Sequence, residues 1–71
     1  MKQQFVYEIS DIHCARCAKK ISLALGYTFG VESTEVSLKN KTAVVSLDLA
    51  RVTTSKIKGI IVALGFSAML V

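Results

Sequence analysis

The 71-residue sequence contains no proline and no tryptophan, and it has only two cysteines and one histidine. A structural zinc site normally takes four protein ligands, most often cysteine and histidine side chains. Two cysteines and a single histidine provide no second pair of ligands for such a tetrahedron. We therefore do not expect a structural zinc ion.

Long apolar runs are also missing. The longest uncharged stretch, residues 59–71, is interrupted by glycine and serine and is too short to cross a bilayer about 30 Å thick. The first residues lack the apolar run and the small-residue cleavage site of a secretory signal. We therefore expect a cytoplasmic protein with no membrane span.

Composition predicts one folded domain over residues 1–71. Hydrophobic residues make up 52% of the chain and charged residues 20%, and the apolar positions recur at regular spacing. The net charge of +4 allows a nucleic-acid partner, but the cations are scattered and the few aromatic residues do not alternate with them. An acidic protein partner fits this pattern better, and we expect no binding of nucleic acid.

The first third of the sequence predicts a strand followed by a helix. In residues 3–10 apolar and polar side chains alternate, as in a strand with one buried face. A helix is predicted from Cys14 to Gly26, because its apolar residues are spaced by three and four: Ala18, Ile21, Ala24 and Leu25.

The remaining sequence predicts a hairpin, a second helix and a last strand. The hairpin strands contain Val31, Val36 and Leu38 and then Ala43, Val45 and Leu47, with a turn at residues 39–41. Thr53 caps a helix that ends at Gly65, and residues 66–71 alternate as a short strand. The order predicts an α+β, ferredoxin-like βαββαβ fold, with a four-stranded antiparallel sheet and two helices on one face.

Cys14 and Cys17 form a Cys-x-x-Cys pair where the first helix begins. The positive end of the helix dipole and the cations Arg16, Lys19 and Lys20 favour thiolates there, so we expect both thiol pKa values to be lowered. Two thiolates suit a soft ion, and Cu(I) is the common biological candidate.

Other interpretations of the pair remain open. A passive disulfide would close a very short loop and would contribute little in a reducing cytosol. A dithiol redox protein also places Cys-x-x-Cys at the start of a helix, but this chain lacks the tryptophan and the cis-proline that usually surround such a pair. Hg(II) and Zn(II) are alternative thiophilic ions.

The sequence resembles the heavy-metal-associated domains of copper chaperones and of copper-transporting P-type ATPases. Their signature is Gly-Met-x-Cys-x-x-Cys, and residues 11–17 here read Asp-Ile-His-Cys-Ala-Arg-Cys. Matching Gly-Val and Gly-Phe pairs follow at Gly30-Val31 and Gly65-Phe66, so that the resemblance covers nearly the whole chain.

The resemblance implies a carrier without enzymatic activity that binds Cu(I) through Cys14 and Cys17. It implies transfer to a copper-transporting P-type ATPase or a cognate copper chaperone, as a partner cysteine attacks the bound ion. Arg16, Lys19 and Lys20 would offset the charge of the bis-thiolate complex and dock the partner. We expect a monomer, which a shared metal ion could bridge into a dimer.

Several positions depart from the family pattern. Asp11 stands in place of glycine, and Ile12 replaces methionine but should remain a buried anchor. We expect His13 to face outward, toward solvent or a partner, because adjacent side chains do not readily point at one ion. Phe66 is expected either beside the metal loop or in the core, and Phe29 is expected to fill core space.

Overall fold

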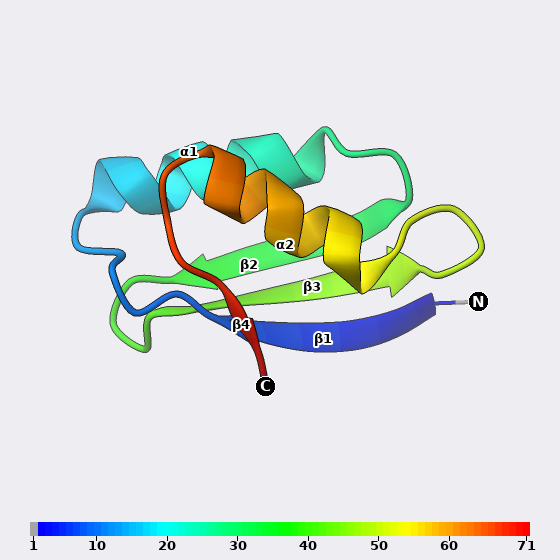
Figure 1. Ribbon diagram of the computed structural model, residues 1–71, viewed down its shortest axis with the longest axis horizontal. Coiled ribbons are helices and arrows are strands. Elements are labelled where there is room, and N and C mark those ends of the chain that lie inside the picture. The colour runs from blue at the N-terminus through cyan, green and yellow to red at the C-terminus, as the bar shows by residue number, and fades with distance from the viewer. Residues whose placement is uncertain (1) are drawn as a thin grey trace.

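The computed structural model describes residues 2–71 and has six elements of secondary structure. They are β1 (Lys2–Glu8), α1 (Ala15–Gly26), β2 (Val31–Ser37), β3 (Thr42–Asp48), α2 (Thr54–Ala63) and β4 (Met69–Leu70). The strands form one antiparallel sheet in the order β2-β3-β1-β4, and both helices cover the same face of it (Figure 1). The predicted ferredoxin-like fold is confirmed.

The core lies between the sheet and the two helices. Alternate residues of β1 and β3 point into it, and each helix contributes apolar residues from one side. The fully buried side chains include Tyr7, Ile9, Ile21, Leu25, Val45, Leu47, Ile57 and Ile61. Tyr7 also joins β1 to α2, because its hydroxyl donates a hydrogen bond to the carbonyl of Thr54 at 2.9 Å. Within residues 2–71, neither helix has the length and apolar character needed to cross a bilayer.

Both helices begin and end close to the predicted positions. Cys14 and Thr53 are the N-cap residues, and each accepts a hydrogen bond from the backbone N–H three residues later. The last residue of α1 is Gly26. Gly65, two residues after the end of α2, has a φ of +99°, a left-handed conformation that glycine adopts without strain.

The strands differ from the prediction in their lengths. β1 stops at Glu8 rather than at residue 10, and Leu38 lies beyond the end of β2. β4 comprises two residues instead of residues 66–71, and it pairs only with Tyr7 and Glu8 of β1. A bulge between Val31 and Ser33 shifts the register of β2, so that Val31 and Val36 both pack against the core.

The expectation that Phe29 fills core space is wrong. Its side chain is 71% exposed, and the guanidinium of Arg51 lies 5.1 Å from the centroid of its ring. Gly30 and Val52 are in close contact instead, since a Cβ atom added to Gly30 would lie 2.8 Å from Cγ1 of Val52. The Phe29 ring lies on the surface, with the Arg51 guanidinium over one of its faces.

Candidate metal centre

The loop between β1 and α1 is anchored by Ile12. Its side chain is fully buried in the core, and its N–H donates to the carbonyl of Ile9 at 3.2 Å, which closes a tight turn. The predicted buried position of Ile12 is therefore confirmed. An anchor directly before His13 and Cys14 holds the start of α1 against the body of the domain.

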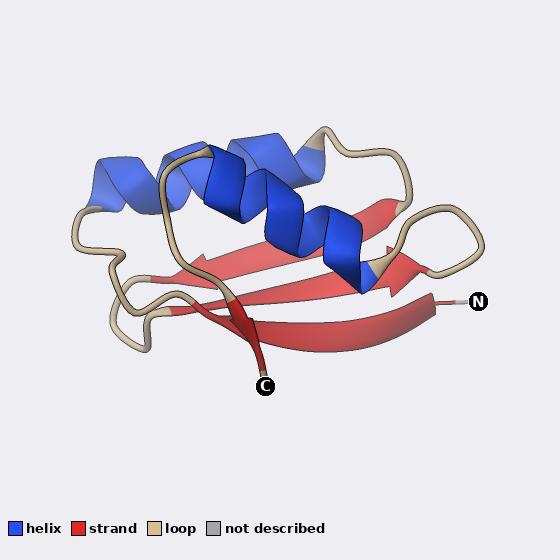
Figure 2. Cartoon of the chain, viewed as in Figure 1, coloured by secondary structure: helices blue, strands red, loops and turns tan. Residues whose placement is uncertain are grey.

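Asp11 ties this loop to the loop that joins α2 to β4. Its carboxylate accepts hydrogen bonds from the N–H of Ser67 at 3.0 and 3.1 Å and from the Ser67 hydroxyl at 3.0 Å. The backbone N–H of Ser67 is the main cause that lowers the pKa of Asp11, and its hydroxyl adds to the effect. Figure 2 shows both loops at the same end of the molecule. The sequence indicated Asp11 only as a departure from glycine and did not indicate its partner.

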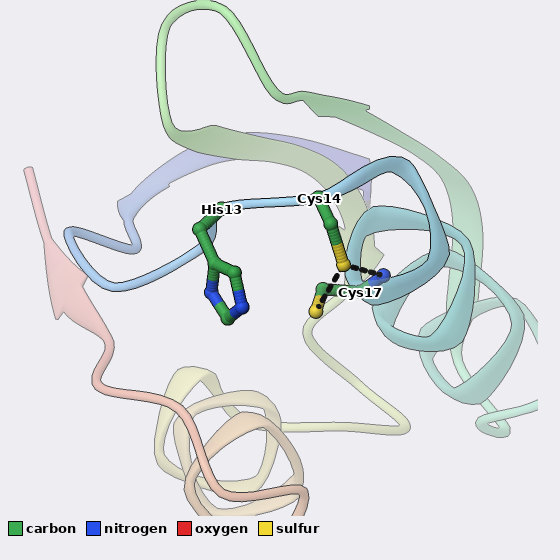
Figure 3. Close-up of side chains that lie close together, drawn as sticks. All are labelled: His13, Cys14 and Cys17. Carbon is green, nitrogen blue, oxygen red and sulfur yellow. Dashed lines mark hydrogen bonds between the residues drawn. The ribbon is translucent and has the colours of Figure 1, made fainter.

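The two thiols lie side by side at the start of α1 (Figure 3). Cys14 has extended backbone angles, φ −150° and ψ 159°, and its Sγ accepts a hydrogen bond from the N–H of Cys17 at 3.3 Å. The two Sγ atoms are 2.8 Å apart, and both cysteines are free and partly exposed. A thiophilic ion can therefore approach both sulfurs from solvent.

The thiols differ in acidity. The hydrogen bond from the Cys17 thiol is the main cause that lowers the pKa of Cys14, and the backbone N–H of Cys17 adds to it. The same thiol hydrogen bond is the main cause that raises the pKa of Cys17. The expectation of two lowered values is thus correct for Cys14 and wrong for Cys17. The two sulfurs share one proton, which stabilises the Cys14 thiolate. Removal of the second proton, from Cys17, is harder because it breaks this hydrogen bond and places two negative charges side by side.

His13 is exposed, as expected, but its side chain does not diverge from the cysteines. A ring nitrogen lies within 4.8 Å of both sulfurs, so that His13, Cys14 and Cys17 form a cluster of three side chains of the types that can bind a metal ion. The Nδ1 atom lies 3.1 Å from the carbonyl oxygen of Asp11. The extended backbone of Cys14 lets these neighbours converge, and the ring is turned toward the sulfurs (Figure 3).

The remaining predicted site residues lie around this cluster or in the core. Arg16, Lys19 and Lys20 are exposed on α1, and within residues 2–71 none of them forms an ion pair. Phe66 is partly buried and packs against the core, in agreement with the interpretation as a core aromatic residue. A place for Phe66 beside the metal loop stays a prediction.

Comparisons with known proteins agree with this geometry. The copper chaperone CopZ of Enterococcus hirae is 37% identical over 68 residues, which cover 96% of each chain. The structure of a copper binding domain from HMA7, a P-type ATPase, aligns with a TM-score of 0.93 and 28% identity and covers 100% of this chain and 95% of its own. The apo form of the Enterococcus hirae copper chaperone aligns with a TM-score of 0.88 and 31% identity, over 94% of this chain and 98% of its own.

The comparison with protein families gives the same assignment. The family model described as "Heavy-metal-associated domain" matches residues 6–67, which include His13, Cys14 and Cys17, both helices, β2 and β3 in full, and the last three residues of β1. This range, the fold and the identity to a copper chaperone over nearly its full length lead to one assignment. The chain belongs to the heavy-metal-associated domain family.

Proposed function

We propose that this domain is a Cu(I) carrier that holds the ion on Cys14 and Cys17 and passes it to a partner by ligand exchange. The observation that carries the proposal is the pair of free, partly exposed thiols 2.8 Å apart at the start of α1. Soft thiolate ligands select soft ions such as Cu(I). The copper-binding relatives support the same choice.

Binding and release follow from the position of the thiols. An ion bridging two sulfurs needs them farther apart than 2.8 Å, and rotation of these partly exposed side chains can open the gap. Two-coordinate Cu(I) leaves space for a partner thiolate. A new copper–sulfur bond forms as one bond to Cys14 or Cys17 breaks, so the ion moves without a change in oxidation state.

Charge compensation and docking would come from the same surface. The N-terminus of α1 offsets part of the negative charge of a bis-thiolate complex. Arg16, Lys19 and Lys20 add exposed positive charge on the same helix, and they would meet an acidic surface of the partner. A copper-transporting P-type ATPase or a cognate chaperone in the cytoplasm would be that partner. We propose a monomer over residues 1–71 that a shared ion can bridge.

The experiment is an anaerobic Cu(I) titration against a competing chelator. We expect the native chain to bind one ion tightly and both Cys14→Ser and Cys17→Ser to lose at least about a hundredfold in affinity, because each leaves a single soft ligand. Ser55→Ala, at an exposed position in the first turn of α2, is the control that should bind as the native chain does. Binding that is weak and indifferent to both cysteine changes would contradict the proposal.

A dithiol redox protein is the second candidate, and the unequal acidity of the thiols is the observation that favours it. A cysteine with a lowered pKa at a helix N-terminus, like Cys14, is the arrangement of an attacking thiol. Turnover of protein disulfides by the reduced domain would support this candidate. A carrier should show no turnover under conditions in which it binds Cu(I) stoichiometrically.

A further inference from the structure

The tautomer of His13 follows from its hydrogen bond. A carbonyl oxygen can only accept, so the contact of 3.1 Å between Nδ1 and the carbonyl of Asp11 requires that Nδ1 carry the proton. In the neutral imidazole the lone pair then lies on Nε2. Metal-binding histidines commonly donate their other ring N–H to a backbone carbonyl in this way, which fixes both the tautomer and the ring orientation.

The loop that supports this hydrogen bond is itself held in place. The Asp11 carboxylate accepts three hydrogen bonds from Ser67, and the buried Ile12 fixes the next position of the chain. The Asp11 carbonyl is therefore a positioned acceptor rather than part of a freely moving turn. The exposed His13 ring is turned toward the two sulfurs (Figure 3).

From these observations we propose that His13 is the third protein ligand when this site holds Zn(II), whereas Cu(I) is held by the two sulfurs alone. The inference rests on the proposed metal site at Cys14 and Cys17. Zn(II) prefers four nitrogen and sulfur ligands, and sites with three protein ligands keep a fourth position for water or another donor. Cu(I) is satisfied by two soft thiolates and gains less from imidazole.

The required movements are small. Tetrahedral Zn(II) with Zn–S bonds of about 2.3 Å and Zn–N bonds of about 2.05 Å needs a sulfur–sulfur distance of about 3.8 Å and sulfur–nitrogen distances of about 3.6 Å. The sulfurs are now 2.8 Å apart, and a ring nitrogen lies within 4.8 Å of both. Adjustments of about 1 Å in exposed or partly exposed side chains close the site without moving the anchored backbone.

The first test compares Zn(II) and Cu(I) affinities of the full chain, measured by competition with chelators of known affinity. We expect His13→Ala to weaken Zn(II) binding at least about tenfold and to change the Cu(I) affinity by less than about threefold. Ser55→Ala is the control that should change neither. Equal Zn(II) affinities for the native chain and His13→Ala would overturn the proposal, and so would equal losses for both ions.

The second test is carried out on the native chain and does not depend on any variant. His13 is the one histidine in the sequence, so the nitrogen resonances of its ring are assigned without ambiguity in a ¹⁵N-labelled sample. Zn(II) should shift Nε2 strongly and leave Nδ1 protonated, and Cu(I) should leave Nε2 close to its apo position. Ring nitrogen resonances that do not shift when Zn(II) is added would overturn this inference alone. The proposed function is overturned separately, if Cys14→Ser and Cys17→Ser bind Cu(I) as the native chain does in the chelator titration.

Discussion

The Asp11 carboxylate accepts hydrogen bonds from both the backbone N–H and the hydroxyl of Ser67, with donor–acceptor distances between 3.0 and 3.1 Å. Because these residues are 56 positions apart in the sequence, no local pattern could indicate the contact. Glycine at position 11 would have no side chain to make it. A glycine here would leave the backbone of the β1–α1 loop free to move. The Asp11 side chain instead links this loop to the loop between α2 and β4.

Unequal thiol acidity predicts unequal alkylation. At neutral pH we expect Cys14 to react faster with iodoacetamide than Cys17, because the thiolate is the nucleophile and the Cys17 thiol lowers the pKa of Cys14. As the pH rises, the Cys14 thiolate forms first, so the pH at which alkylation of Cys14 is half-maximal should be lower than the corresponding pH for Cys17. Trypsin cleaves after Arg16, between the two cysteines, so mass spectrometry at low conversion measures both rates.

Cys17→Ala is the control for this prediction. It removes the thiol that donates to Cys14 but retains the backbone N–H of residue 17, which also donates to Cys14. The pH of half-maximal alkylation of Cys14 should therefore rise, and the remaining backbone N–H limits the rise. Equal rates at the two cysteines of the native chain would contradict the assigned direction of the hydrogen bond.

At the scale of elements, three glycines predict three different responses to alanine. Gly59 lies in α2 with nothing within 4 Å of an added Cβ, so Gly59→Ala should raise the free energy of unfolding by about 0.5 to 1 kcal/mol. Gly65 also has open space around an added Cβ, but its φ of +99° strains any residue with a side chain. Gly65→Ala should therefore lower the free energy of unfolding by about 1 kcal/mol. Gly30→Ala should lower it by about 2 kcal/mol or more, because strain at φ +96° adds to the clash with Val52.

Urea unfolding of the three variants measures this order, and the pair Gly65→Ala and Gly30→Ala separates backbone strain from steric overlap. Both positions have positive φ, and only Gly30 has neighbouring atoms at 2.8 to 3.0 Å from an added Cβ. If the two variants were equally stable, Val52 would have to move aside at little cost. That result would contradict the tight contact between the α1–β2 loop and the β3–α2 loop.

The sequence predicted the elements well because each has a clear period. The spacing of apolar residues in both helices and the alternation in β1 and β3 reflect burial on one face, and the order of elements then leaves few folds. The alternation in residues 66–71 overestimated β4, because part of this segment is needed to descend from α2 to the sheet (Figure 1). The alternation of apolar and polar residues could not show the bulge after Val31 either, because a bulge shifts the alternation by one residue.

For the candidate site, the sequence was sufficient to predict that the cysteine pair stands at the start of a helix and that Ile12 is buried, because both depend on local position. It was not sufficient for the convergence of His13, which depends on the backbone angles at Cys14 and on the acceptor at Asp11. The direction of the thiol hydrogen bond likewise depends on which sulfur receives the backbone N–H. These are properties of the folded loop rather than of its residue types.

For the whole molecule, metal binding should stabilise the fold. A ligand at a free concentration of 100 times its dissociation constant adds about 2.7 kcal/mol if it binds only the folded chain. For a domain of this size, we expect an increase in Tm of up to about 10 to 20 °C, measured by anaerobic calorimetry with and without Cu(I). The double variant Cys14→Ser and Cys17→Ser should show no increase, and an unchanged Tm in the native chain would contradict stoichiometric binding to the folded site.

The brevity of β4 has a further consequence for the molecule in concentrated solution. Beyond its pairing with Tyr7 and Glu8, the outer edge of β1 has no neighbouring strand over residues 2–5. Such an edge is a template on which a strand of another chain can add, and this is how soluble domains begin to aggregate. Lys2, Gln3 and Gln4 are exposed there, and their polar side chains oppose stacking of copies. These three polar residues at the start of β1 therefore protect the open edge from pairing with another copy of the domain.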